Sequence, residues 1–338
     1  MGPAGASIIN SIRFLCLLCV CCSPGVVAAE TRDLILIAGQ SNAVGYDTKA
    51  SELPADAADK DILFWWRTGD PPPDEHDSTS GGKWTHLQSQ PKGNPDHQFG
   101  NFANADGGFG PEIGLARALY AKGNKQLAIV KAAWNGTSMA QAWNPADRGD
   151  GGSCYRALVS ETKAAMAAAG SQGITLRLRA FVWVQGESDA NATAAPRYEK
   201  ALGDMIAALR KDLDSPQLIA LLAVNTKYGG GTNPFMPKIV EAQQALAAKD
   251  PRCAYVDTAS ATIANTAHFD TAGTLDVGRR CAEALLKIEA KAAPSSDAPS
   301  PGKKSEWRLR PLRFPGGQDS ARLKRKAPDY PSLVYYFP

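Results

Sequence analysis

The alternation of apolar segments with helical patterns constrains the fold of this chain most strongly. Five segments are rich in aliphatic and β-branched residues and have the character of buried strands: 33–38, 127–133, 178–185, 217–224 and 253–257. Helical spacing of apolar residues, at intervals of three and four, marks 111–122, 154–169, 196–213, 236–249 and 271–290. Strands that alternate with helices form parallel sheets covered on both faces. We therefore expect an α/β fold around a mostly parallel, five-stranded sheet.

The N-terminal region has the features of a secretory signal. Arg13 is the only charged residue before Glu30, and residues 14–22 are apolar. This apolar run is shorter than the roughly 20 residues that span a bilayer, which argues against the alternative of a membrane anchor. Small residues at 27–29 suit cleavage before Glu30. We predict a signal peptide over residues 1–29, a secreted or periplasmic protein, and no stable membrane insertion after cleavage.

The C-terminal region differs in composition from the rest of the chain. Residues 291–338 hold ten Lys and Arg against four Asp and Glu, together with many Pro and Ser. Such a composition is typical of a disordered basic tail, although adhesion to an acidic polysaccharide is an alternative. The folded domain is thus predicted to span residues 30–290.

Charge and cysteine content exclude some other classes. The formal charge of the 338 residues is only +3, too small to indicate nucleic-acid binding. Outside the predicted signal peptide three cysteines remain, Cys154, Cys253 and Cys281, so at most one intramolecular disulfide can form. Their spacing matches no zinc motif, and buried structural cysteines are the preferred interpretation.

The tetrapeptide Gly39–Asn42 directly follows the first predicted strand. Ser41 is therefore placed at the carboxyl end of a strand, the edge where open α/β sheets bind ligands. A serine there can serve as a nucleophile. Plain turn chemistry is the alternative for these residue types.

Three further motifs follow the ends of later predicted strands. They are Trp134–Ser138, Gln185–Asp189 and His268–Asp270. Because a parallel sheet brings these loops to one edge, Ser41 and His268 are expected to meet there. Such a pair supports acyl transfer, in which the serine attacks a carbonyl and the histidine takes and returns its proton. Gly136 would let a backbone amide approach the developing oxyanion.

Together the four motifs resemble those of the SGNH (GDSL-type) hydrolases, in their carbohydrate-esterase branch. The similarity is to family six, the sialate O-acetylesterase-like and acetylxylan-esterase-like proteins. The matching blocks are Gly-Gln-Ser-Asn at 39–42, Gly-Thr-Ser at 136–138, Trp-Val-Gln-Gly-Glu-Ser-Asp at 183–189 and His-Phe-Asp-Thr-Ala-Gly at 268–273. They occur in the family's order and cover roughly residues 32–290.

The resemblance implies a three-layer α/β/α, flavodoxin-like fold and ester deacetylation without a metal or other cofactor. It implies Ser41 as the nucleophile and His268 as the general base. The oxyanion donors it implies are the backbone amides of Ser41 and Gly136 and the side chain of Gln185.

One position departs from the superfamily pattern. The aspartate that usually stands three residues before the histidine is Asn265 in this chain. A neutral amide can orient an imidazole but gives little support to the imidazolium. We therefore predict Glu187 as the orienting acid, with Asp257 and Asp270 as alternatives.

The long segment between residues 47 and 109 breaks the strand–helix alternation. It is rich in Gly, Pro and Asp, and such long irregular insertions are usually functional or mobile. A short edge strand at 62–66 is an option. Its histidines, His76, His86 and His97, have no metal-binding spacing, and solvated loop residues are the preferred interpretation. Four tryptophans are candidates either for stacking on sugar rings or for core packing: Trp65, Trp66, Trp84 and Trp143.

These observations predict a secreted serine esterase that removes O-acetyl groups from a carbohydrate. Acetylated hemicellulose and O-acetylated sialic acid are the two substrates considered. A non-catalytic carbohydrate-binding relative is the alternative, because Asn265 replaces the usual acid. The sequence does not predict the sugar-binding residues or the oligomeric state.

Overall fold

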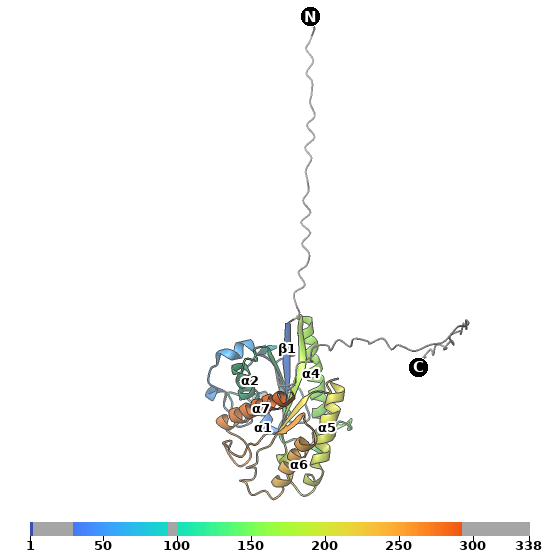
Figure 1. Ribbon diagram of the computed structural model, residues 1–338. Coiled ribbons are helices and arrows are strands. Elements are labelled where there is room, and N and C mark those ends of the chain that lie inside the picture. Colours follow the sequence, from blue (N-terminus) through green and yellow to red (C-terminus); the bar gives the residue numbers. More distant parts are fainter. Residues whose placement is uncertain (3–29, 94–100, 293–338) are drawn as a thin grey trace, which may run out of the picture. The chain divides into compact units, whose positions relative to one another are not determined.

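Strand β1, Glu30–Gly39, lies at the centre of the sheet in the computed structural model (Figure 1). The model describes residues 1–2, 30–93 and 101–292. On either side β1 pairs in parallel with β5, Leu127–Trp134, and β6, Ile174–Val184. All eight residues of β5 are buried, as expected of a parallel strand covered on both faces.

Within the described residues the sheet has eight strands, so the predicted number of five is too small. The predicted segments correspond to β1, β5, β6, β7 (Ile219–Ala223) and β8 (Cys253–Tyr255), and these run parallel. The additional parallel strand is β2, Leu63–Gly69, which overlaps the edge strand considered at 62–66. Two-residue strands β3, Ser78–Thr79, and β4, Thr85–His86, pair with it in antiparallel fashion. They are too short to leave a periodic signal in the sequence.

Helices cover both faces of the sheet, which confirms the predicted α/β architecture (Figure 1). Helices α2, Glu112–Ala121, and α7, Thr271–Ala292, pack together on one face. The other face carries α4, Ser153–Ser171, α5, Tyr198–Asp212, and α6, Met236–Lys249. Each predicted helix is present with its ends shifted by at most two residues.

Short elements complete the described chain. Two four-residue helices follow strands β1 and β5, namely α1, Ser41–Val44, and α3, Met139–Ala142. Five 3₁₀ turns lie in the connections: η1 Ala50–Glu52, η2 Ala57–Asp61, η3 Asp150–Gly152, η4 Glu187–Asp189 and η5 Ala195–Arg197. The motif-bearing loops after β1, β5 and β6 therefore leave the sheet at its carboxyl edge.

Three further sequence predictions concern cysteines, membranes and the chain ends. Cys154, Cys253 and Cys281 are free and buried, as preferred. Among the helices of the described residues, none has the length and apolar character needed to cross a bilayer. Residues 3–29 of the predicted signal peptide and residues 293–338 of the predicted tail lie outside the described residues.

Candidate active site

Ser41 occupies the first position of α1, immediately after a tight turn out of β1. The turn is closed by Gln40, whose amide donates to the carbonyl of Val184 at 3.1 Å. Gly39 has a φ of +138°, and a Cβ at this position would lie 2.1 Å from the same carbonyl oxygen. Only glycine fits this close approach of β1 to the end of β6. The Gly-Gln-Ser sequence thus aims the serine outward at the edge of the sheet.

His268 lies directly against this serine. The Nε2 atom of His268 is 2.9 Å from Oγ of Ser41, although the two residues are 227 positions apart. The histidine precedes helix α7 in the loop after β8. The sequence prediction that these two residues meet at the carboxyl edge of the sheet is therefore confirmed by the geometry.

Asp47 holds the opposite side of the imidazole. Its Oδ2 atom is 2.5 Å from Nδ1 of His268. This hydrogen bond is the main cause that lowers the pKa of Asp47 below its ordinary value, so the carboxylate stays ionised. Ser41, His268 and Asp47 thus form a continuous serine–imidazole–carboxylate chain of contacts.

Asn265 links this carboxylate to the histidine loop. Its Nδ2 group donates to Oδ2 of Asp47 at 2.7 Å. Its Oδ1 atom accepts from the amides of Ala267 and His268 at 2.9 and 3.0 Å. The residue at the superfamily's usual acid position therefore orients an acid that comes from elsewhere in the chain.

The prediction that Glu187 orients His268 is wrong. The Oε1 atom of Glu187 accepts from the side chain of Asn42 at 2.7 Å and from the amide of Asn225 at 3.0 Å. Burial raises the pKa of this carboxyl group. The carboxylate therefore contacts Asn42 of helix α1 and not the imidazole. The alternatives Asp257 and Asp270 instead accept hydrogen bonds within their own loops.

Glu187 nevertheless supports the site through Asn42. Asn42 donates to the carbonyl of Ala267 at 3.0 Å and accepts from the amide of Phe269 at 3.0 Å. These two bonds flank His268 in the chain and connect its loop to helix α1. Glu187 thus fixes the side chain that bridges helix α1 and the loop of His268.

A cavity of about 390 Å³ opens over Ser41 and His268. Its other lining residues are Gln40, Tyr46, Asp70, Asn135, Gly136, Ser188, Tyr228 and Ala267. Gly136 has a φ of +65° and faces open space, so the loop after β5 reaches the cavity by its backbone. Within the described part of the chain, the amides of Ser41 and Gly136 have no recorded hydrogen-bond acceptor. Both amides are therefore available to a substrate oxygen.

The model of the carbohydrate esterase, sialic acid-specific acetylesterase family matches residues 31–287 of this chain. The chain belongs to this family. It is therefore a carbohydrate acetylesterase, a carboxylic ester hydrolase. The resemblance inferred from the four sequence motifs is confirmed.

Two solved structures share the fold of this chain. A protein from Arabidopsis thaliana has a TM-score of 0.55 at 21% identity, over 76% of this chain and 98% of the other. NanS has a TM-score of 0.53 at 18% identity, over 78% of this chain and 99% of the other. These likenesses show the fold. The comparison with curated proteins found no match.

The side chain of Gln185 does not face the cavity of this esterase, so its predicted role as an oxyanion donor is wrong. Gln185 is fully buried, and its Nε2 group donates to the carbonyl of Thr137 at 3.0 Å and to Asp189 at 2.6 Å. Asp189 also accepts from the amide of Met139 at 3.0 Å. A buried carboxylate needs such donors. The pair instead holds the loop that carries Gly136.

The tryptophans pack in the core of the esterase rather than at its cavity. Trp65, Trp66 and Trp143 are at least 94% buried. Trp84 packs against Trp65 and donates to a carbonyl of α4. The aromatic residues that line the cavity are Tyr46 and Tyr228, which stand in irregular loops and gave no motif in the sequence.

Proposed function

We propose that this esterase removes O-acetyl groups from a carbohydrate through Ser41, His268 and Asp47. The observation that carries the proposal is the continuous chain of contacts from Ser41 Oγ through the imidazole to the Asp47 carboxylate, at 2.9 and 2.5 Å. The alternative, a non-catalytic carbohydrate-binding protein, rests on Asn265, which replaces the usual acid. Asp47 supplies a carboxylate at the imidazole, which favours the catalytic function.

The arrangement supports nucleophilic catalysis in two stages. Asp47 accepts a hydrogen bond from the Nδ1–H group of the neutral imidazole, so Nε2 carries no proton and can accept the Ser41 hydroxyl proton. The serine oxygen then attacks the acetyl carbonyl carbon and forms a tetrahedral intermediate. When the bond to the sugar oxygen breaks, His268 returns the proton to that oxygen and the deacetylated sugar leaves. Water attacks the acetyl-serine with the same histidine as base, which releases acetate and restores the serine.

The developing oxyanion requires preorganised donors. The amides of Ser41 and Gly136 are the candidates, since both border the cavity and neither has a recorded acceptor among the described residues. The negative charge on the oxygen of the intermediate would thus be stabilised by hydrogen bonds from two backbone amides. Hydrogen bonds of neighbouring residues hold these amides in place.

The charge of the cavity favours a neutral sugar over O-acetylated sialic acid. Asp70 lines the cavity, and none of the described lining residues is a lysine or arginine. Among the described lining residues no cation is present to pair with the carboxylate of a sugar acid, so we infer that neutral acetylated saccharides, such as those of hemicellulose, are the better substrates. Tyr46 and Tyr228 offer ring faces to such a sugar.

The predicted signal sequence supports a location outside the cytoplasm, where an acetylated polysaccharide would be encountered. The decisive experiment is a test of catalysis. Release of acetate from acetylated xylo-oligosaccharides is measured for the wild-type protein and for Ser41→Ala. Acetate release that is equal in both would refute the proposed function.

A further inference from the structure

A buried ion pair that the proposed mechanism does not use lies beside the helix that carries Ser41. Lys131 on strand β5 and Glu112 on helix α2 have fully buried side chains, and Nζ lies 3.0 Å from Oε1. Moving two charges out of water is costly, and an isosteric apolar pair is often at least as stable. Stability alone is therefore a weak reason for a lysine in the middle of an otherwise apolar strand.

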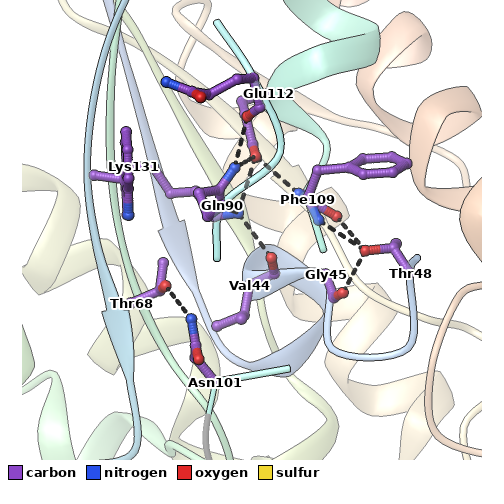
Figure 2. Close-up of polar contacts among 12 residues, drawn as sticks. Val44, Gly45, Thr48, Thr68, Gln90, Asn101, Phe109, Glu112 and Lys131 are labelled. Carbon is purple, nitrogen blue, oxygen red and sulfur yellow. Dashed lines mark hydrogen bonds and ion pairs between the residues drawn. The ribbon is translucent and has the colours of Figure 1, made fainter. Parts of the chain in front are cut away.

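The ammonium group makes a contact that bears on the nucleophile. Its three N–H groups are matched by three acceptors: the carbonyl of Val44 at 2.7 Å, Oε1 of Gln90 at 2.7 Å, and Glu112. Val44 is the last residue of α1, whose first residue is Ser41. Figure 2 shows Lys131, Gln90 and Glu112 gathered at this end of the helix. Lys131 thus anchors the carboxyl end of the nucleophile helix to the sheet.

Glu112 extends the anchor to a second segment of the chain. Its Oε1 atom also accepts from the amide of Gly110 at 2.8 Å and from Nε2 of Gln90 at 3.0 Å. Gly110 follows Phe109, whose amide donates to Oγ1 of Thr48 at 2.8 Å. The backbone at Phe109 and Gly110 is therefore bound both by Thr48 and by Glu112 of the ion pair.

Thr48 closes the segment that contains the proposed acid. Its hydroxyl lies 2.7 Å from the carbonyl of Gly45, and its amide donates to the same carbonyl at 3.0 Å (Figure 2). The amides of Gly45 and Tyr46 donate to the carbonyl of Ser41 at 2.8 and 3.0 Å. Residues 41–48 thus form one hydrogen-bonded unit with the nucleophile at its start and Asp47 near its end.

We propose that Lys131 and Glu112 are positioning residues, which hold residues 41–48 so that Ser41 and Asp47 both meet His268. This inference rests on the proposed function of these three residues. His268 enters from a distant loop, so its distances to Ser41 and Asp47 depend on where that unit lies. A displacement of about 1 Å at a reacting group can lower turnover by roughly 10²-fold.

The test replaces both charges at once. In Lys131→Met/Glu112→Gln no unpaired charge is buried, but the Val44 carbonyl loses its donor. With 4-nitrophenyl acetate as substrate we expect kcat to fall by about 10- to 100-fold. KM should stay within about twofold of the wild-type value, since the residues that line the cavity are unchanged. A folded double variant with the wild-type kcat would overturn the proposal.

Arg179→Met is the matched control. Arg179 is largely buried and pairs with Glu289 at 2.7 Å, and it has no recorded bond to residues 41–48 or place in the cavity lining. Both variants are expected to lose thermal stability, whereas only the double variant is expected to lose kcat. An equal loss of kcat in the control would mean that the effect is general destabilisation and would refute the positioning role.

Two further measurements keep the proposal testable if the double variant does not fold. Thr48→Val removes the hydroxyl that closes the unit and should also lower kcat with little change in KM; a wild-type kcat in this variant would contradict the proposal. Labelling of Ser41 by a fluorophosphonate tests the nucleophile without a sugar. If the wild-type protein is labelled but releases no acetate from sugars, the proposed substrate fails, while slower labelling of Thr48→Val still supports positioning.

The pathway of the effect is tested in an Asp47→Asn background. If the ion pair acts through Asp47 and Ser41, the combined variant should lose less kcat than the product of the two separate fold-losses in kcat, that of Asp47→Asn and that of Lys131→Met/Glu112→Gln. A purely structural role predicts multiplicative losses, and that result would overturn the proposal.

Discussion

Asp47 contacts the imidazole of His268 from a position only six residues after Ser41, with Oδ2 2.5 Å from Nδ1. The proposed nucleophile and the proposed acid therefore belong to one short segment, whereas the histidine comes from the other end of the domain. In the superfamily pattern the acid stands three residues before the histidine, so the acid and the histidine share one segment. In this chain Asn265 occupies that position and orients the loop, whereas the carboxylate comes from Asp47 in the serine segment.

The first prediction concerns Ser41 and His268. Ser41→Ala and His268→Ala should each lower acetate release by several orders of magnitude without loss of folding. Because the two residues act as one unit, the double variant should be little worse than either single one. Steady-state acetate release and thermal unfolding of the three variants check this. Multiplicative losses in the double variant would contradict a shared step.

The second prediction separates Asp47 from Asn265. Asp47→Asn should lower kcat by roughly 10²- to 10⁴-fold, because a neutral partner leaves the imidazolium unsupported and can select the wrong tautomer. Asn265→Asp should also lower activity at pH 8, because it places a second carboxylate beside Asp47 in place of the amide that donates at 2.7 Å. Activity of this variant should recover partly as the pH falls and one carboxyl group takes up a proton. An activating effect at pH 8 would show that Asn265, and not Asp47, marks the place of the acid.

Asp47 also makes a pH-dependent contribution to stability. Its pKa in the folded protein is lowered, chiefly by the hydrogen bond with His268. The stabilisation is therefore present above the unfolded value of about 4 and is lost as the pH falls through the lower folded pKa. The difference in Tm between wild type and Asp47→Asn should be larger at pH 6 than at the lowest pH at which both fold. A constant difference across this range would contradict the assigned ionisation.

The sequence predicted the parts of the site that follow strands. Ser41 and Gly136 follow buried strands, and His268 lies shortly before helix α7, so the alternation of strands and helices was enough to bring their loops to one edge. Asp47 was not predicted because it lies at the start of an irregular segment that has no periodicity. Its place is set by hydrogen bonds of Gly45, Tyr46 and Thr48, which no residue pattern in the sequence marks.

Glu187 and Gln185 were misassigned for a related reason. Both occupy a motif at the end of β6, and sequence position places the backbone of that motif at the site but does not determine where each side chain points. The side chain of Glu187 accepts a hydrogen bond from Asn42, and that of Gln185 donates to Thr137 and Asp189. Which side of the loop faces the cavity depends on tertiary packing.

The third prediction tests Glu187 in its observed role. Glu187→Gln keeps an oxygen that can accept from Asn42 and Asn225, so we expect kcat to fall by less than about tenfold, far less than for Asp47→Asn. Burial raises the pKa of Glu187 in the folded protein, so its ionised form destabilises the fold as the pH rises through that pKa. The gain in Tm from Glu187→Gln should accordingly be larger at pH 8 than at pH 4. A loss of turnover as large as that of Asp47→Asn would restore Glu187 as the acid.

The fourth prediction concerns the chain beyond the core. Helix α7 ends at Ala292, and its buried residues complete the core on one face of the sheet. Deletion of residues 295–338 should therefore leave turnover of 4-nitrophenyl acetate and Tm unchanged. If the truncated chain unfolds or loses activity, the domain boundary predicted near residue 290 is wrong.

The fifth prediction concerns the sugar. We expect a higher kcat/KM for neutral acetylated xylo-oligosaccharides than for O-acetylated sialic acid, because the described cavity lining includes Asp70 and has no lysine or arginine to pair with a carboxylate. Asp70→Asn should narrow this ratio, and its effect should shrink at high salt, since screening weakens the interaction between exposed charges. A neutral acetyl ester serves as the control, because Asp70→Asn should change its turnover far less than that of the acidic sugar. Faster turnover of O-acetylated sialic acid by the wild-type protein would mean that the cavity recognises the acid by groups other than its described lining, and the preference for neutral sugars would then be abandoned.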